Sequence, residues 1–155
     1  MIIFFLRHAD AEDSSGNDFE RKLTNKGLDQ AARVGNFCKK FGITPEVFLT
    51  SPLVRTRQTA EIVSKKTGTT PVIADWLACG MTPSTLIENL EPLGTISSAL
   101  LVGHEPDFSA AVSYLLGLPE PVNFPIRKAS LTAIDAPWLD RGSGMLKFTL
   151  PPRFL

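Results

Sequence analysis

The sequence contains two histidines, and each of them follows a run of apolar residues. His8 ends the segment IIFFLRH at residues 2–8, and His104 ends the segment SALLVGH at residues 98–104. Runs of this kind are typical of strands that are buried on both faces of a sheet. Ligands of open α/β sheets bind at the carboxyl ends of the strands, so we expect both imidazoles at one reactive edge.

Two arginines are candidates to join the histidines. Arg7 precedes His8, and Arg55 lies in the first turn of a helix expected directly after a short strand at 47–50. Guanidinium groups match phosphate oxygens in a bidentate way, and histidine can act as a nucleophile near neutral pH. Each residue alone is more often structural, as a satisfied strand-end histidine or a solvated helix arginine. Together the four predict a site that handles phosphate.

The pattern along the chain predicts strands that alternate with helices. The loop at 9–23 is polar and turn-rich, Thr24 is a candidate N-cap, and Gly68 is a candidate helix stop. We expect strands at 2–8, 47–50, 71–74, 98–103, 129–135 and 145–150, and helices at about 25–41, 52–67, 82 or 84 to 90, and 108–116. This order predicts a three-layer α/β/α sandwich in one domain over residues 1–155, with a mostly parallel sheet and a C-terminal antiparallel strand pair.

Composition excludes several classes of function. The chain of 155 residues has 16 Lys and Arg against 16 Asp and Glu, so we expect neither a nucleic-acid surface nor polybasic recruitment to a membrane. The first apolar run stops at Arg7, which is too short for a signal peptide, and no apolar run reaches 18 residues. Cys38 and Cys79 predict no disulfide framework, and free thiols suit a cytoplasmic protein.

Other catalytic signatures do not compete with the histidines and arginines. The sequence has no GxxxxGK[ST] loop and no GxSxG elbow. Two histidines without a paired acidic spacing make a poor zinc site. We therefore expect no metal and no cofactor.

Four motifs resemble the histidine phosphatase superfamily, which is also called phosphoglycerate mutase-like. They are LRHADAE at 6–12, LTNKG at 23–27 followed by QA at 30–31, SPLVRTRQTA at 51–60 and VGHEP at 102–106. They occur in the family's order and cover essentially the whole chain, and their compact form is most similar to the SixA-type phosphohistidine phosphatases. One departure is Ala9, where the family commonly has glycine; we expect tolerance if φ at this residue is negative.

The resemblance implies a role for each matching residue. His8 would be the nucleophile that carries a transient phosphoryl group, and Arg7, Arg55 and His104 would complete a pocket that also accepts phosphate or sulfate. The backbone N–H of Glu105, at the start of a helix, would add a contact. We expect the arginines to keep His8 neutral, a backbone carbonyl to fix its tautomer, and His104 to be protonated.

The leaving group indicates the substrate. Larger members of the superfamily supply an acidic group after the third strand, but residues 75–81 contain no glutamate, and Asp75 looks like a strand-end residue. Imidazole leaves more readily than an alkoxide, because its conjugate acid has a pKa of about 6.5. The lack of an obvious acid therefore favours phosphohistidine over phosphate monoesters as the substrate. Asp10, and also Glu105, are candidate acids, and the alternative for Asp10 is a carboxylate that caps its loop.

The expected partner is a histidine-phosphorylated protein such as a phosphotransfer domain. Only the segments 9–23, 75–83 and 117–127 are long enough to form a lid, so we expect an open site on a monomer. The sequence leaves open whether the proline-rich segment 117–127 lies near the site or is a connector. Two other functions stay open at this point: a small-molecule phosphomonoesterase of the same superfamily, and a phosphate-binding module without catalysis.

Overall fold

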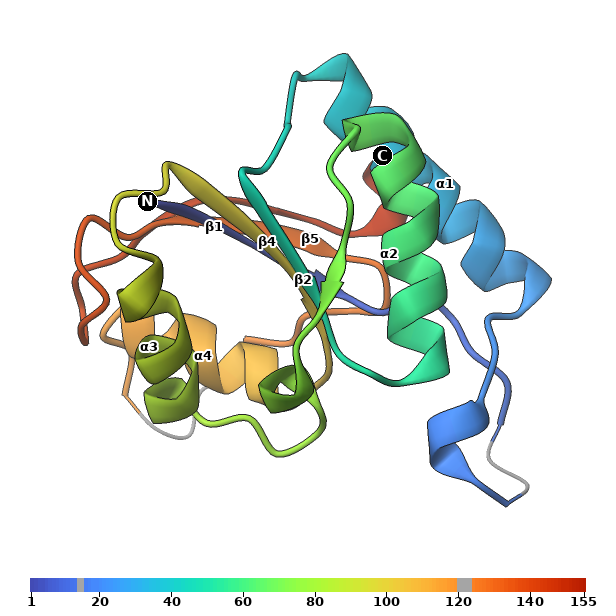
Figure 1. Cartoon of the computed structure of the whole chain (residues 1–155), viewed down its shortest axis with the longest axis horizontal. Helices are drawn as coiled ribbons and strands as arrows, with labels where there is room; N and C mark the ends of the chain where they lie inside the picture. The colour runs from blue at the N-terminus through green and yellow to red at the C-terminus, as the bar shows by residue number, and fades with distance from the viewer. Residues whose placement is uncertain (14–15, 120–123) are drawn as a thin grey trace.

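The computed structural model describes residues 1–13, 16–119 and 124–155, and its centre is one six-stranded sheet (Figure 1). The strand order is β3-β2-β4-β1-β5-β6. β1 pairs in parallel with β4, and β2 pairs in parallel with β4 and β3, whereas β5 is antiparallel to both β1 and β6. The strands are β1 Ile2–Arg7, β2 Val47–Thr50, β3 Val72–Ile73, β4 Ser98–Gly103, β5 Leu131–Asp135 and β6 Met145–Leu150. The predicted sheet is confirmed.

Helices cover both faces of this sheet. α1 (Asn25–Lys40) and α2 (Val54–Thr67) pack on one face, and α3 (Pro83–Leu90) and α4 (Asp107–Leu115) pack on the other (Figure 1). The side chains of β1 alternate accordingly. Ile3 and Phe5 belong to the core under α3 and α4, and Phe4 and Leu6 belong to the core under α1 and α2. The three-layer sandwich is therefore confirmed.

β1 and β4 are the two central strands, and their register determines where the site lies. Arg7 is opposite Gly103, so His8 and His104 leave the sheet at the same edge. The amide N–H of His8 still donates to the carbonyl of Gly103, at 3.0 Å. The shared edge predicted from the two apolar runs is confirmed.

The start of α2 differs from the prediction. The helix was expected from Pro52 but begins at Val54, with Leu53 as an extended N-cap. The amide N–H of Ser51 donates to the carbonyl of Val102 at 2.9 Å, which continues the β2–β4 ladder by one residue and keeps the chain extended. The later start places Arg55 in the first turn of the helix, beside the strand ends.

Two strand boundaries also differ. β3 is confined to Val72–Ile73, and Asp75 is the first residue of the 3₁₀ helix η2 (Asp75–Leu77) rather than a strand end. β5 begins at Leu131 instead of 129, because Ala129 has a φ of 55° and forms a turn. The remaining short helices are η1 Asp18–Glu20, inside the predicted loop 9–23, η3 Glu91–Leu93 and η4 Pro152–Phe154.

Two predictions about segments have a limited outcome. Part of the proline-rich segment 117–127, namely residues 120–123, lies outside the described residues. Within the described parts of the chain, we find no helix with the length and apolar character that crossing a membrane requires.

Candidate active site

His8 lies at the end of β1 with its ring almost fully buried. Its Nδ1 is 2.8 Å from the carbonyl oxygen of Ala9. A carbonyl can only accept a hydrogen bond, so Nδ1 carries the proton and Nε2 holds the lone pair. The expected tautomer is confirmed. The φ of Ala9 is outside the left-handed region, and its N–H donates to Thr59 Oγ1 at 3.1 Å, so the substitution for glycine is accommodated.

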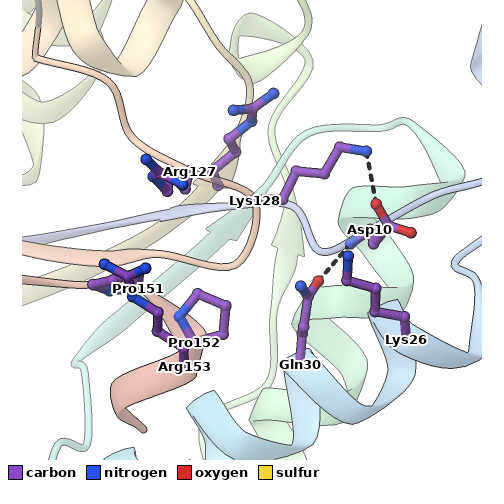
Figure 2. A pocket seen from close by; sticks show the side chains of 9 residues that line it. Asp10, Lys26, Gln30, Arg127, Lys128, Pro151, Pro152 and Arg153 are labelled. Atoms are coloured by element: carbon purple, nitrogen blue, oxygen red, sulfur yellow. Dashed lines mark hydrogen bonds and ion pairs between the residues drawn. The ribbon is translucent and has the colours of Figure 1, made fainter.

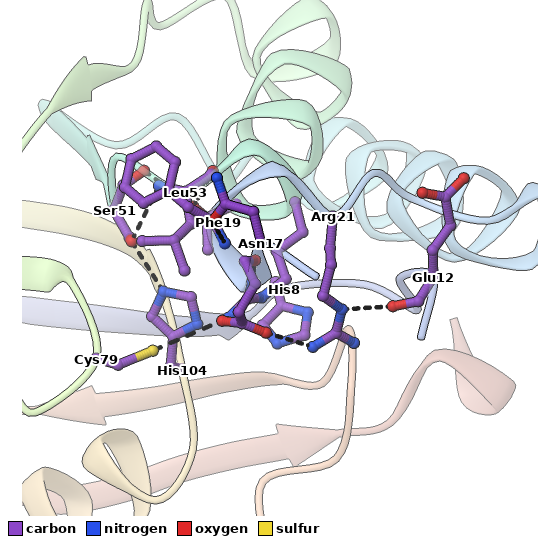
Figure 3. A network of polar contacts seen from close by, with 12 residues as sticks. His8, Glu12, Asn17, Phe19, Arg21, Ser51, Leu53, Cys79 and His104 are labelled. Carbon is purple, nitrogen blue, oxygen red and sulfur yellow. Dashed lines mark hydrogen bonds and ion pairs between the residues drawn. The ribbon is translucent and has the colours of Figure 1, made fainter. Parts of the chain in front are cut away.

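His104 lies beside His8, with 5.4 Å between the ring centroids. Its Nε2 is 2.8 Å from Ser51 Oγ, which places the carboxyl ends of β1, β2 and β4 around one point (Figure 3). Its Nδ1 is buried and has no hydrogen-bond partner among the described residues. A buried nitrogen of this kind is costly unless something binds it, so this ring is equipped to contact a ligand.

Both imidazoles are held neutral. Burial lowers the pKa of His8 to about 4, with smaller contributions from Arg55 and Arg7. Burial, the neighbouring His8 and Arg55 lower the pKa of His104 to about 3. For His8 the expected neutral state is right, but burial rather than the arginines is its largest cause. The expectation of a protonated His104 is wrong, because the ring is buried among cations.

Two arginines lie close enough to both imidazoles for their positive charge to lower the pKa of each ring. The Arg55 side chain is buried, and Nη1 donates to the carbonyl of Asp18 at 2.7 Å. Arg7 donates through Nη1 to the carbonyl of Ile126 at 2.9 Å. The Nε atoms of both arginines are buried without a partner in the described part of the chain. Each guanidinium therefore has an Nε–H group left to donate a hydrogen bond to an anion.

Arg21 is a further cation at this site, and the sequence analysis missed it. Asp18, in η1, lies 3.1 Å from Arg55 Nη2 through one carboxylate oxygen and 2.7 Å from Arg21 Nη1 through the other. Figure 3 shows the Arg21 guanidinium pointing toward the part of the site where the His8 ring lies. The only signal in the sequence was a lone arginine in the polar loop after His8. The Asp18 carboxylate bridges two guanidiniums much as two phosphate oxygens would.

Comparisons with known proteins agree with this geometry. Residues 3–78 match the histidine phosphatase superfamily (branch 1). The chain is also 30% identical, over 80% of its length and 82% of the relative's, to a phosphohistidine phosphatase SixA homolog of Haemophilus influenzae. This chain belongs to the histidine phosphatase superfamily. Within the superfamily it is of the SixA type.

Solved structures share the fold of this superfamily member. The protein histidine phosphatase SixA complexed with tungstate has a TM-score of 0.86 at 23% identity, with 99% of this chain and 98% of that chain covered. The α-ribazole phosphatase of Shigella flexneri has a TM-score of 0.82 at 15% identity, with 98% and 97% covered. The fold is thus common to enzymes with different substrates.

Asp10, a candidate acid, is held in its ionised form. Oδ1 is 2.8 Å from Lys128 Nζ, and Oδ2 accepts a hydrogen bond of 2.8 Å from Thr24 Oγ1. The hydrogen bond with Lys128 is the largest cause of the lowered pKa of Asp10. A carboxylate in this state has no proton to donate, and its contacts fasten the loop after His8 to the start of α1. They favour the loop-capping alternative.

Glu105 lies in a different environment. Burial raises the pKa of its carboxyl, although the charge of Arg7 opposes the shift. Ser109 Oγ hydrogen bonds to Oε2, and Oε1 is buried without a partner among the described residues. α4 begins at Asp107, so Glu105 lies two residues before the helix and not at its start as expected. Of the two candidate acids, Glu105 is the one whose surroundings favour a protonated carboxyl.

Metal-ligating side chains do not cluster in the part of the chain that the structure describes. Over residues 1–13, 16–119 and 124–155, no group of three or more His, Cys, Asp or Glu residues is placed to hold a metal ion. Cys38 is buried in α1, and Cys79 is exposed, with Sγ 3.9 Å from Arg55 Nη2.

Proposed function

We propose that this enzyme removes phosphoryl groups from histidine-phosphorylated proteins through a covalent phospho-His8 intermediate. The observation that carries the proposal is the state of His8. Its ring is neutral, with a pKa of about 4, and Nδ1 is committed to the carbonyl of Ala9. Nε2 therefore presents a lone pair at neutral pH, which is what nucleophilic attack on phosphorus requires.

The first step transfers the phosphoryl group from the substrate to His8. Nε2 forms a bond to phosphorus while the P–N bond of the substrate breaks, and the substrate's imidazole leaves as a neutral ring because its other nitrogen is protonated. Arg7 and Arg55 stabilise the charge on the transferred oxygens. We infer that the Ser51 hydroxyl donates to His104 Nε2, so that Nδ1 of His104 carries the proton and is a neutral donor to the transferred oxygens. Water then attacks phospho-His8 and releases inorganic phosphate.

The arrangement of acids supports phosphohistidine as the substrate. Asp10 is ionised, and Asp75 is exposed in η2. An imidazole leaving group needs less help from an acid than an alkoxide does. The sequence resemblance to a SixA homolog points in the same direction. Because the arginines supply the positive charge, we infer that the reaction needs no metal. A phosphoprotein partner and a cytoplasmic location stay predictions.

One observation favours a small-molecule phosphomonoesterase as the second candidate. An alkoxide leaving group needs a proton donor, and burial raises the pKa of Glu105, whose carboxyl is close enough to Arg7 to feel its charge. A non-catalytic binding module is less well supported. It would not need a neutral, oriented imidazole at His8 beside the charges of Arg7 and Arg55.

The two enzymatic candidates are separated by a direct comparison of rates. We would measure kcat/KM on a histidine-phosphorylated phosphotransfer domain and on a panel of phosphate monoesters, with and without EDTA. The proposal predicts a preference for the phosphoprotein by at least about tenfold, and no loss of rate with EDTA. A preference for monoesters would favour the second candidate and contradict the proposal.

A further inference from the structure

A cavity of about 550 Å³ lies next to the candidate active site and is lined by an unusual concentration of positive charge. Figure 2 shows the cationic side chains around it, which come from the end of β1, the start of α1, the turn before β5 and η4. The five cationic residues are Arg7, Lys26, Arg127, Lys128 and Arg153, and the acidic one is Asp10. We refer to it as the basic cavity.

The charge of the basic cavity is not compensated locally. Asp10 is paired with Lys128 at 2.8 Å. Among the described residues, Arg7, Lys26, Arg127 and Arg153 form no salt bridge. The whole chain has equal numbers of acidic and basic residues, so these cations are collected here and do not reflect an overall basic surface. Like charges brought together by separate segments repel one another, unless an anion binds between them.

The backbone attaches this cavity to the candidate nucleophile. The amide N–H of Ala129 donates to the carbonyls of both Arg7 and His8, at 3.1 Å each. The turn that carries Arg127 and Lys128 is thereby fixed to the end of β1. Arg7 lines the cavity and also acts on the two imidazoles. A group bound in the cavity therefore lies close to whatever occupies the His8 site.

We propose that the basic cavity is a docking subsite for acidic side chains that flank the phosphohistidine of a protein substrate. This inference rests on the proposed function. The cavity is wide, and Lys26, Arg127 and Arg153 are exposed at its walls. Long, exposed cations attract several carboxylates over a surface, as at the rim of a protein interface, whereas a subsite for a single phosphate would need buried, converging donors.

The test uses three synthetic phosphohistidine peptides of equal length, in which the phosphohistidine is flanked by glutamates, by glutamines or by lysines. We expect kcat/KM for the glutamate peptide to exceed that for the glutamine peptide by roughly tenfold at low salt. This ratio should shrink as the salt concentration rises, because the charges are exposed.

Charge reversal assigns the preference to the cavity. The double variant Lys26→Glu/Arg153→Glu should lower the ratio to about one and should improve turnover of the lysine peptide. The matched control is Lys39→Glu/Lys65→Glu, which makes the same change of charge at exposed positions in the last turns of α1 and α2. We expect the control to retain the native ratio. Thermal unfolding verifies that both double variants are folded.

Three results would overturn the inference. The first is equal hydrolysis of the glutamate and glutamine peptides by the native enzyme. The second is an unchanged ratio in Lys26→Glu/Arg153→Glu. In the third, bisphosphorylated small molecules would be preferred over the glutamate peptide, and the same variant would abolish that preference, which would assign the cavity to a metabolite. If none of the peptides were hydrolysed while p-nitrophenyl phosphate was, the proposed function itself would fail, and that outcome is distinct from the others.

Discussion

At the scale of the residue, the hydroxyl of Ser51 determines how His104 is presented to a ligand. Ser51 Oγ contacts Nε2 at 2.8 Å, which leaves Nδ1 as the ring nitrogen free to bind an anion. We predict that Ser51→Ala lowers kcat by about tenfold, because a buried hydrogen bond is worth roughly 1–3 kcal/mol once its partner is left unsatisfied. Steady-state kinetics would measure the loss.

The control for Ser51 is Ser64→Ala, which removes a hydroxyl from α2 that donates to the carbonyl of Glu61 within the same helix. If Ser51 were only structural, Ser51→Ala would lower the stability of the fold but leave the pH profile of kcat unchanged. A positioning role should instead shift the acidic limb of kcat against pH. Native kinetics in Ser51→Ala would contradict the role given to His104.

At the scale of the element, the 3₁₀ helix η1 places the carboxylate of Asp18 against two arginines. Asp18 contacts Arg55 and Arg21 and is half exposed. We predict that Asp18→Ala strengthens competitive inhibition by inorganic phosphate by about three- to fivefold, because a competing carboxylate is removed; the effect is modest since the pair is partly solvated. Inhibition constants for phosphate would measure it, and weaker inhibition would mean that Asp18 positions the arginines instead.

The start of α1 depends on a close backbone contact. A Cβ on Gly27 would lie 2.0 Å from the carbonyl oxygen of Asp10, whereas a Cβ on Gly16 would meet no atom of the described residues within 4 Å. We predict that Gly27→Ala lowers the free energy of unfolding by roughly 1–3 kcal/mol and that Gly16→Ala leaves it nearly unchanged. Urea denaturation measures both, and equal stabilities would show that the Asp10 loop yields freely. This contact explains why glycine ends the LTNKG motif.

At the scale of the whole molecule, the buried histidines couple stability to pH. Their pKa values in the folded protein, about 4 and about 3, lie below the ordinary value of 6.5. Between pH 6.5 and 4 the unfolded chain therefore binds protons that the folded chain does not, and stability falls as the pH falls. We expect His104→Asn to reduce this slope in urea denaturation between pH 7 and 4.5; an unchanged slope would contradict the burial of a neutral His104.

The sequence predicts those features that depend on local pattern. The apolar runs before His8 and His104 identify the two central strands, and Thr24 caps α1 as expected, accepting from the N–H of Gly27 at 3.1 Å. Features that depend on tertiary contacts were missed. The approach of Arg21 and Asp18 to Arg55 needs the folded loop, and the neutral state of His104 follows from burial.

The central claim is that His8 carries the phosphoryl group. The most direct test is to mix the enzyme with a ³²P-labelled, histidine-phosphorylated phosphotransfer domain, quench the reaction within milliseconds and separate the proteins. We predict an acid-labile, alkali-stable label on the native enzyme that is lost in His8→Ala, together with turnover. Label on another residue, or full turnover by folded His8→Ala, would contradict the account.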